Sequence, residues 1–134
     1  MKPILLPTLR YPRAWFCLGL LIAASITVVS LMPAEHLPSV GISDKLEHAL
    51  AYLLLGFWFA SVIARWDYVY LVFALLALGG SIEIAQGLMG VGRQADWRDL
   101  LADGFGVLSG VGLAATPLGH WANFIEDRLV RRPR

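Results

Sequence analysis

Long apolar segments constrain the possible folds of this chain more than any other feature of its sequence. A helix needs roughly 20 mostly apolar residues to cross about 30 Å of hydrocarbon, and four segments approach that length: residues 14–32, 46–64, 68–90 and 100–119. Apolar and polar residues do not alternate within them, which argues against the strands of a membrane β-barrel. We therefore predict an all-α membrane protein built as a bundle of four transmembrane helices.

The composition agrees with this class. Hydrophobic residues make up 57% of the chain and charged residues 16%, whereas soluble domains typically carry about 25% charged residues. No linker, low-complexity tract or repeat divides the chain, so residues 1–134 are predicted to form a single domain. The formal net charge of +1 gives no basic field that would attract nucleic acid, and we expect membrane components as partners instead.

The first apolar segment has two interpretations, because a basic leader with Lys2, Arg10 and Arg13 precedes it. A secretory signal peptide has such a leader, but its apolar region is shorter and ends at a small-x-small cleavage site. The sequence "VVSLMPA" at the end of this segment contains no clear site of that kind. We therefore expect an uncleaved transmembrane helix.

Lysine and arginine are distributed unevenly between the two sides of the predicted bundle. The N-terminal leader, the second connection and the C-terminal tail carry eight of them, and the first and third connections carry three. Because cytoplasmic loops are enriched in these residues, both termini are predicted to be cytoplasmic. The tail places Trp121, Phe124, Ile125 and Leu129 on one helical face, which predicts a C-terminal helix lying at the membrane interface.

Polar residues gather at the outward-facing ends of the second, third and fourth segments. An ionisable group inside a membrane costs a few kcal/mol unless it is paired or faces the bundle interior, so it indicates a functional site. The deepest is Glu83, which lies about 10 Å along the helix axis from Gly90. The predicted site residues are Asp44, Lys45, His48, Glu83, Gln86, Arg93, Asp96, Asp99 and Asp103.

Helical spacing indicates that several of these residues can share one interior. Asp99 and Asp103 are four residues apart and therefore lie on one face, as do His48 and Tyr52. The aspartate face continues into a row of small residues that would let two helices approach closely: Ala102, Gly106, Gly110 and Ala114. The carboxylates are thus predicted to border a helix-packing seam.

Three stretches, "DKLEHALAYLLLG", "EIAQ" and "GRQADWRDLLADGFGVLSG", together resemble the VanZ-like family of small bacterial membrane proteins. The family pattern runs D-K-x-x-H, E-x-x-Q and G-R-x-x-D-x-x-D, followed by a glycine-rich span, and the resemblance covers residues 44–110. It implies a location in the bacterial cytoplasmic (inner) membrane and a role at the cell envelope. The founding member is associated with reduced susceptibility to the glycopeptide teicoplanin. This chain departs from the pattern at Asp103, where the family usually has asparagine.

Some of these residues also have a purely structural interpretation. Asp44 and Asp96 each precede a second acidic residue by three positions, which is the spacing of a helix capping box. Arg98 is placed as an interfacial residue that extends its charge toward water. Arg93 is placed to hold a carboxylate, and Glu83 is the best candidate.

Three classes of function fit these patterns. The first is an envelope protein whose outward pocket binds a lipid headgroup or a lipid-linked wall precursor on Arg93, Lys45 and His48. The second is a membrane-embedded enzyme that uses His48, Glu83 and Asp99 as acid, base or ligands of a divalent metal. The third is a structural network of ion pairs. We favour the first. No established catalytic signature occurs in the chain, and the sequence leaves enzymatic activity, cofactor and oligomeric state open.

Overall fold

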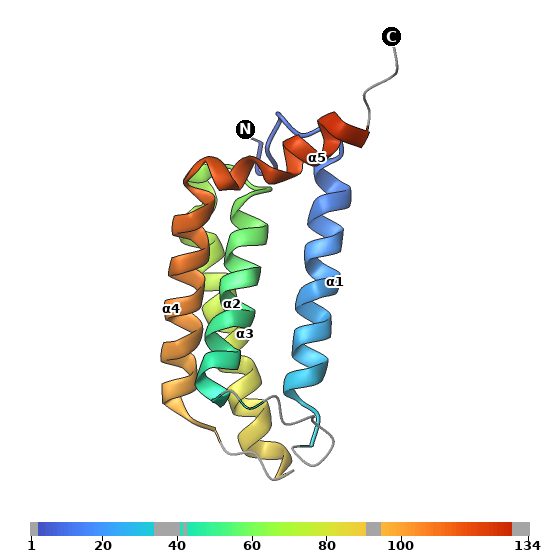
Figure 1. Ribbon diagram of the computed structural model, residues 1–134. Coiled ribbons are helices and arrows are strands. Elements are labelled where there is room, and N and C mark those ends of the chain that lie inside the picture. The colour runs from blue at the N-terminus through green and yellow to red at the C-terminus, as the bar shows by residue number, and fades with distance from the viewer. Residues whose placement is uncertain (1–2, 34–40, 42, 91–94, 130–134) are drawn as a thin grey trace.

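The computed structural model describes residues 3–33, 41, 43–90 and 95–129. Four long helices stand side by side, and a shorter fifth helix lies across one end of them (Figure 1). Two short 3-10 turns, η2 and η3, connect the helices at that same end. The elements are α1 (Pro12–Ser30), α2 (Asp44–Ala60), η2 (Arg65–Asp67), α3 (Tyr68–Met89), α4 (Trp97–Ala114), η3 (Pro117–His120) and α5 (Trp121–Leu129).

The predicted all-helical fold is confirmed, and one long helix overlaps each of the four apolar segments, although α1, α2 and α4 begin two or three residues before them. By length and composition, α1 and the continuous helical run from Arg65 to Met89 can cross a membrane. A third crossing is reached if α4 and the following Pro117–Leu129 segment count as one span, although they are bent by 75°. The described part of the chain thus has two or three candidate spans, and a bundle with four spans stays a prediction.

Two of the helices end four and five residues before the predicted segments do. The helix predicted for 46–64 ends at Ala60, because the residues after it pair with the extended N-terminal segment: Leu6 N donates to Val62 O at 2.9 Å, and Ala64 N to Ile4 O at 2.8 Å. The helix predicted for 100–119 ends at Ala114, and Pro117, which has no N–H to donate, begins η3.

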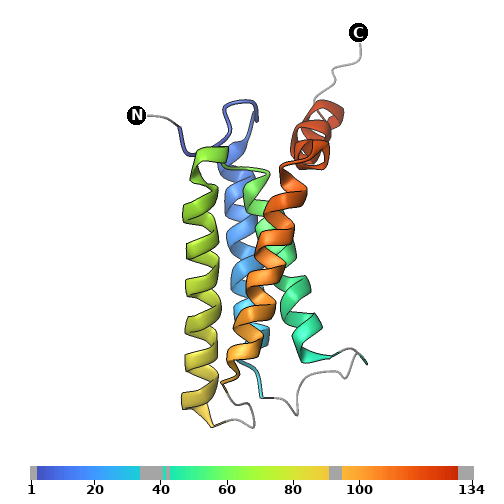
Figure 2. The same ribbon diagram turned by 90° about the vertical axis from the view of Figure 1, so that its left-hand side faces the viewer.

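The tightest helix pair is α2 with α4, which cross one another (Figure 2). A Cβ atom on Gly106 would lie 2.9 Å from the Leu53 amide nitrogen and still closer to the Ala49 carbonyl oxygen. A Cβ on Gly110 would lie 2.6 Å from the Phe57 amide nitrogen. These glycines therefore let α4 rest on the backbone of α2, as the row of small residues predicts.

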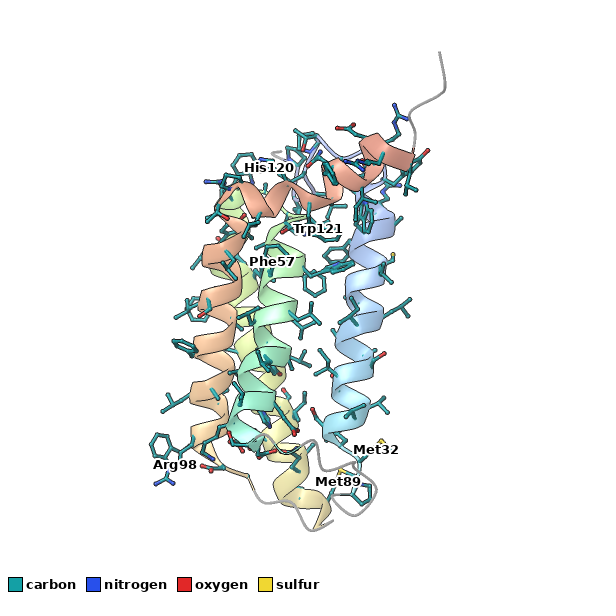
Figure 3. All side chains as sticks on the ribbon, viewed as in Figure 1. Met32, Phe57, Met89, Arg98, His120 and Trp121 are labelled. Carbon is teal, nitrogen blue, oxygen red and sulfur yellow. The ribbon has the colours of Figure 1, made fainter. Side chains whose placement is uncertain are left out.

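Helix α1 is held mainly through aromatic contacts with α2 and α5. The rings of Trp15 and Trp121 lie 5.1 Å apart edge to face, and those of Trp58 and Trp121 lie 4.7 Å apart. Gly19 makes room for this packing, since a Cβ there would lie 2.7 Å from the Trp58 ring. Figure 3 shows Trp121 at the end of the bundle that α5 covers.

A carboxylate on α5 caps the beginning of α1. Glu126 accepts hydrogen bonds from the backbone N–H groups of Arg10 (2.6 Å) and Tyr11 (2.9 Å) and from the Trp15 indole N–H (2.9 Å). Burial acts to raise the pKa of Glu126, but these three donors together lower it below its ordinary value. A negative charge at this position also suits the positive end of the helix dipole.

The glycine seam generates a test with a matched control on the same helix. Gly106→Ala should lower the free energy of unfolding by about 1–3 kcal/mol, because the added methyl group meets the α2 backbone. Gly112→Ala should raise it by about 0.5–1 kcal/mol through higher helix propensity, since nothing lies within 4 Å of a Cβ there. Denaturant unfolding in detergent, followed by circular dichroism, measures both. Equal effects of the two substitutions would contradict the seam.

Candidate functional site: a buried histidine–carboxylate cluster

The beginnings of α2 and α4 and the end of α3 meet at the end of the bundle opposite α5 (Figures 1 and 2). Local capping positions two of these helix ends. Ser43 is the N-cap of α2, and its hydroxyl accepts from Leu46 N at 3.3 Å; the capping role considered for Asp44 is therefore wrong, because Asp44 is already the first helical residue. Asp96 is the N-cap of α4 and accepts from Arg98 N at 2.9 Å, as predicted.

The centre of the cluster is a buried pair formed by His48 of α2 and Asp103 of α4. His48 Nδ1 lies 2.9 Å from Asp103 Oδ1, and the two residues are 8% and 0% exposed. We assign the proton of this bond to Nδ1, with the Asp103 carboxyl oxygen as its acceptor. The other ring nitrogen, Nε2, lies 4.0 Å from Glu83 Oε1 of α3.

Tyr52 and Gly79 complete this inner layer. A Cβ on Gly79 would collide with Asp103 Oδ2 and would lie 3.1 Å from the Tyr52 hydroxyl, so glycine lets both groups reach the surface of α3. Neither residue is among the predicted site residues. The four-residue spacing between His48 and Tyr52 is the sequence signal that indicates the tyrosine, whereas only the structure distinguishes Gly79 from Gly80, which has open space around it.

The inner layer contains polar atoms that no group in the structure satisfies. Three side-chain oxygens of this layer are buried without a hydrogen-bond partner: Tyr52 Oη, Glu83 Oε1 and Asp103 Oδ2. Buried polar atoms are nearly always paired, and leaving one unpaired costs about 1–3 kcal/mol. Such atoms at one end of a bundle indicate a site that receives a further group.

An outer layer of charges covers this centre on the solvent side. Lys45 Nζ lies 3.1 Å from Asp96 Oδ2 and 3.2 Å from Asp99 Oδ1. Hydrogen bonds first to Asp96 and then to Asp99 raise the pKa of Lys45. The Arg98 N–H, followed by Lys45, lowers the pKa of Asp96. Both groups are therefore charged at neutral pH.

Asp96 also links the outer layer to the inner one, because its backbone N–H donates to Glu83 Oε2 at 2.9 Å. At the beginning of α4, the backbone of Asp96 thereby holds the Glu83 carboxylate of α3. The side chain of Asp96 accepts from Lys45 of α2. Through this residue all three helices are joined at their polar ends.

The structure brings most of the predicted site residues together. Seven of them lie in the two layers or beside them: Asp44, Lys45, His48, Glu83, Asp96, Asp99 and Asp103. Gln86 is buried at the same end, but its amide donates to the Ser30 carbonyl at 2.8 Å and so joins α3 to the end of α1. Arg93 lies outside the described residues. Arg98 points away from the bundle (Figure 3), as an interfacial residue would.

Part of the cluster has the geometry of a cation site. Asp44, His48 and Asp99 can each offer one ligand atom such that these atoms lie within 4.8 Å of one another. His48 and Asp99 are buried and Asp44 is exposed, so the group is open toward solvent. His48 and Asp99, the pair predicted to share a site, thus lie close together. The direct hydrogen-bond partner of the imidazole, however, is Asp103.

Comparison of the chain with protein-family models, curated proteins and solved structures found no match. Fold and site together define an all-helical protein with candidate membrane spans and a buried histidine–carboxylate cluster at one end of its bundle.

The two layers predict different responses to losing their positive member. His48→Leu leaves Asp103 buried beside no donor and should lower the free energy of unfolding by about 3–5 kcal/mol, the usual cost of breaking a buried pair. Lys45→Met should change it little, because the Lys45 side chain is 47% exposed and exposed pairs are screened by solvent. Unfolding in detergent distinguishes them, and a larger loss for Lys45→Met would reverse the assignment of inner and outer layers.

Proposed function

We propose that this chain is a VanZ-like multipass protein of the bacterial cytoplasmic membrane, in which an outward-facing polar pocket binds the headgroup of a lipid or of a lipid-linked wall precursor. The observation that carries the proposal is the set of buried, unpaired oxygens beside His48, which three helices bring to one end of the bundle. A hydrated headgroup with several donors would satisfy them.

The order of the helices supports four membrane crossings. Helices α1 and α3 are each long and apolar enough to span, and both run from the α5 end of the bundle to the polar end (Figure 1). The chain must return across the same distance between them, and α2 is the segment that returns. Helix α4 makes the final crossing, parallel to α2, toward α5.

The position of α5 supports an interfacial role. It follows α4 after a bend of 75° and therefore lies nearly at right angles to the bundle. Ala122 and Glu126 face the protein, whereas Phe124 and Leu129 are exposed. Arg128 packs over the Phe124 ring at 4.6 Å. A helix with exposed apolar side chains and arginines beyond them suits the cytoplasmic membrane surface, where anionic lipids attract basic residues.

A structural network alone accounts poorly for the cluster. Ion pairs in a bundle interior stabilise less well than apolar packing, and here three buried oxygens gain no partner at all. The cost of this arrangement favours a function that uses the polar atoms.

A membrane-embedded enzyme is the second candidate. One observation favours it: Asp103 orients the His48 ring through Nδ1, as a carboxylate orients the histidine of a general base. In that proposal His48, Glu83 and Asp99 act on a lipid or a lipid-linked substrate. The resemblance to the VanZ-like family also extends the proposal to glycopeptide susceptibility, which deletion of the gene followed by teicoplanin titration would test.

Lipid retention tests the pocket. Native mass spectrometry of the gently purified protein should detect a bound lipid or wall precursor. The near-isosteric changes His48→Asn and Asp99→Asn should remove it while the melting temperature stays within a few degrees, because shape and some hydrogen bonding survive. Asp127→Asn, an exposed carboxylate on α5, is the matched control and should retain it. Equal retention by all four proteins would contradict the proposed pocket.

Thiol labelling tests the orientation. In a Cys17→Ala background, a cysteine at Gln94 should react with a membrane-impermeant reagent on intact spheroplasts, and one at Asp127 should react only after lysis. The reverse pattern would place the polar cluster on the cytoplasmic side and would overturn an envelope function, whatever the pocket binds.

A further inference from the structure

We infer that Asp44, His48 and Asp99, whose ligand atoms converge, bind a divalent cation beside the buried Glu83, and that open coordination positions on this cation bind an anionic headgroup. Two independent features of the described residues lead to this site: the convergence of three potential ligands, and a buried glutamate oxygen that has no hydrogen-bond partner.

The orientation of the His48 imidazole supports a role for this residue as a metal ligand. A histidine that binds a metal through one nitrogen almost always donates its other N–H to a carboxylate or carbonyl, which fixes the ring and raises the basicity of the ligand atom. His48 has this arrangement, since Nδ1 is engaged by the fully buried Asp103 at 2.9 Å. Nε2 is left to act as the ligand atom.

The second feature is the contact between that nitrogen and Glu83. His48 Nε2 and Glu83 Oε1 face each other at 4.0 Å, which is too long for a hydrogen bond. Ligand atoms at about 2.0–2.2 Å from a tetrahedral ion lie roughly 3.3–3.6 Å apart, so a small contraction would bring both atoms onto one cation.

The balance of charge points the same way. Five carboxylates surround the site (Asp44, Glu83, Asp96, Asp99 and Asp103), and among the described residues Lys45, the titratable His48 and, beside Asp96, Arg98 oppose them. An anionic phosphate entering such a cluster would be repelled. A bound divalent cation removes the repulsion and offers open coordination positions to phosphate oxygens.

The ligand types define the class of ion. Several carboxylates with one imidazole suit a hard or borderline cation such as Mn²⁺ or Zn²⁺ better than a soft one. The atoms of Asp44, His48 and Asp99 lie within 4.8 Å of one another, so the group would contract slightly around the ion.

Lys45 leads to a second expectation, which concerns the affinity of the site for the cation. Its ammonium group lies 3.2 Å from Asp99 Oδ1 and therefore competes with a cation for the same carboxylate. Removing this positive charge should strengthen cation binding. A purely structural ion-pair network predicts no gain of any kind from the same change.

The test uses the full chain, purified in detergent, stripped with EDTA and titrated with Mn²⁺ alone while electron paramagnetic resonance reports free Mn²⁺. We expect one ion per chain. His48→Asn should weaken binding at least tenfold, and Asp103→Asn by about 10–100-fold, as changes in the partner of a metal-bound histidine do. Lys45→Met should tighten binding several-fold, a result that misfolding cannot produce. Asp127→Asn should leave the affinity unchanged.

Failure to bind stoichiometric Mn²⁺ or Zn²⁺ would overturn the site, as would affinity that is insensitive to His48→Asn. Unchanged or weaker binding by Lys45→Met would overturn the assignment of Asp99 as a ligand. The headgroup part of this inference rests on the proposed function, and the two can fail separately. If the protein binds Mn²⁺ but retains no lipid, the cation site is supported and the proposed headgroup binding is overturned. If EDTA-stripped protein retains lipid but binds no Mn²⁺, headgroup binding is supported and the cation site is overturned.

Discussion

The contact on which the rest of the structure depends is the close approach of α4 to the backbone of α2. Gly106 and Gly110 have no Cβ to hold the helices apart, and α4 therefore rests against the α2 backbone between Ala49 and Phe57. Asp103 and Asp99 precede Gly106 by one and two turns on the same face. The same approach therefore carries these two carboxylates to His48 and Lys45, so the polar cluster follows from the packing seam.

Because the helices are held together by this contact, the protein can tolerate the cost of burying carboxylates in the cluster. A carboxylate with no exposure, Asp103, is costly to bury and is only partly compensated by His48. The apolar contacts of α2 and α4 with Leu75 and their other neighbours keep the helices in place regardless. Close helix approach at the glycines and apolar packing stabilise the scaffold and offset the cost of burying the polar cluster.

Much of this arrangement is predictable from one-dimensional spacing. Apolar length predicts the helices, the row of small residues predicts the seam, and alternating helix direction brings the three polar ends together. The pairing of His48 with Asp103, in contrast, depends on how far one helix is rotated and shifted against another, and spacing within a single helix carries no such information. The same holds for Gln86, which contacts Ser30 of α1. Glu126 caps a helix more than a hundred residues earlier in the chain, a contact that no local pattern indicates.

An asparagine at position 103, the residue usual in the family that the chain resembles, would change the electrostatics of this cluster more than its geometry. An asparagine at this position could still accept the His48 Nδ1–H through its side-chain oxygen, so the ring orientation would survive. It would lack the negative charge that makes Nε2 a stronger electron-pair donor, and it would place an amide or oxygen near the Tyr52 hydroxyl without adding charge. The aspartate thus leaves the hydrogen-bond geometry alone and changes the electrostatics, making the space between His48 and Glu83 more favourable for a positive charge.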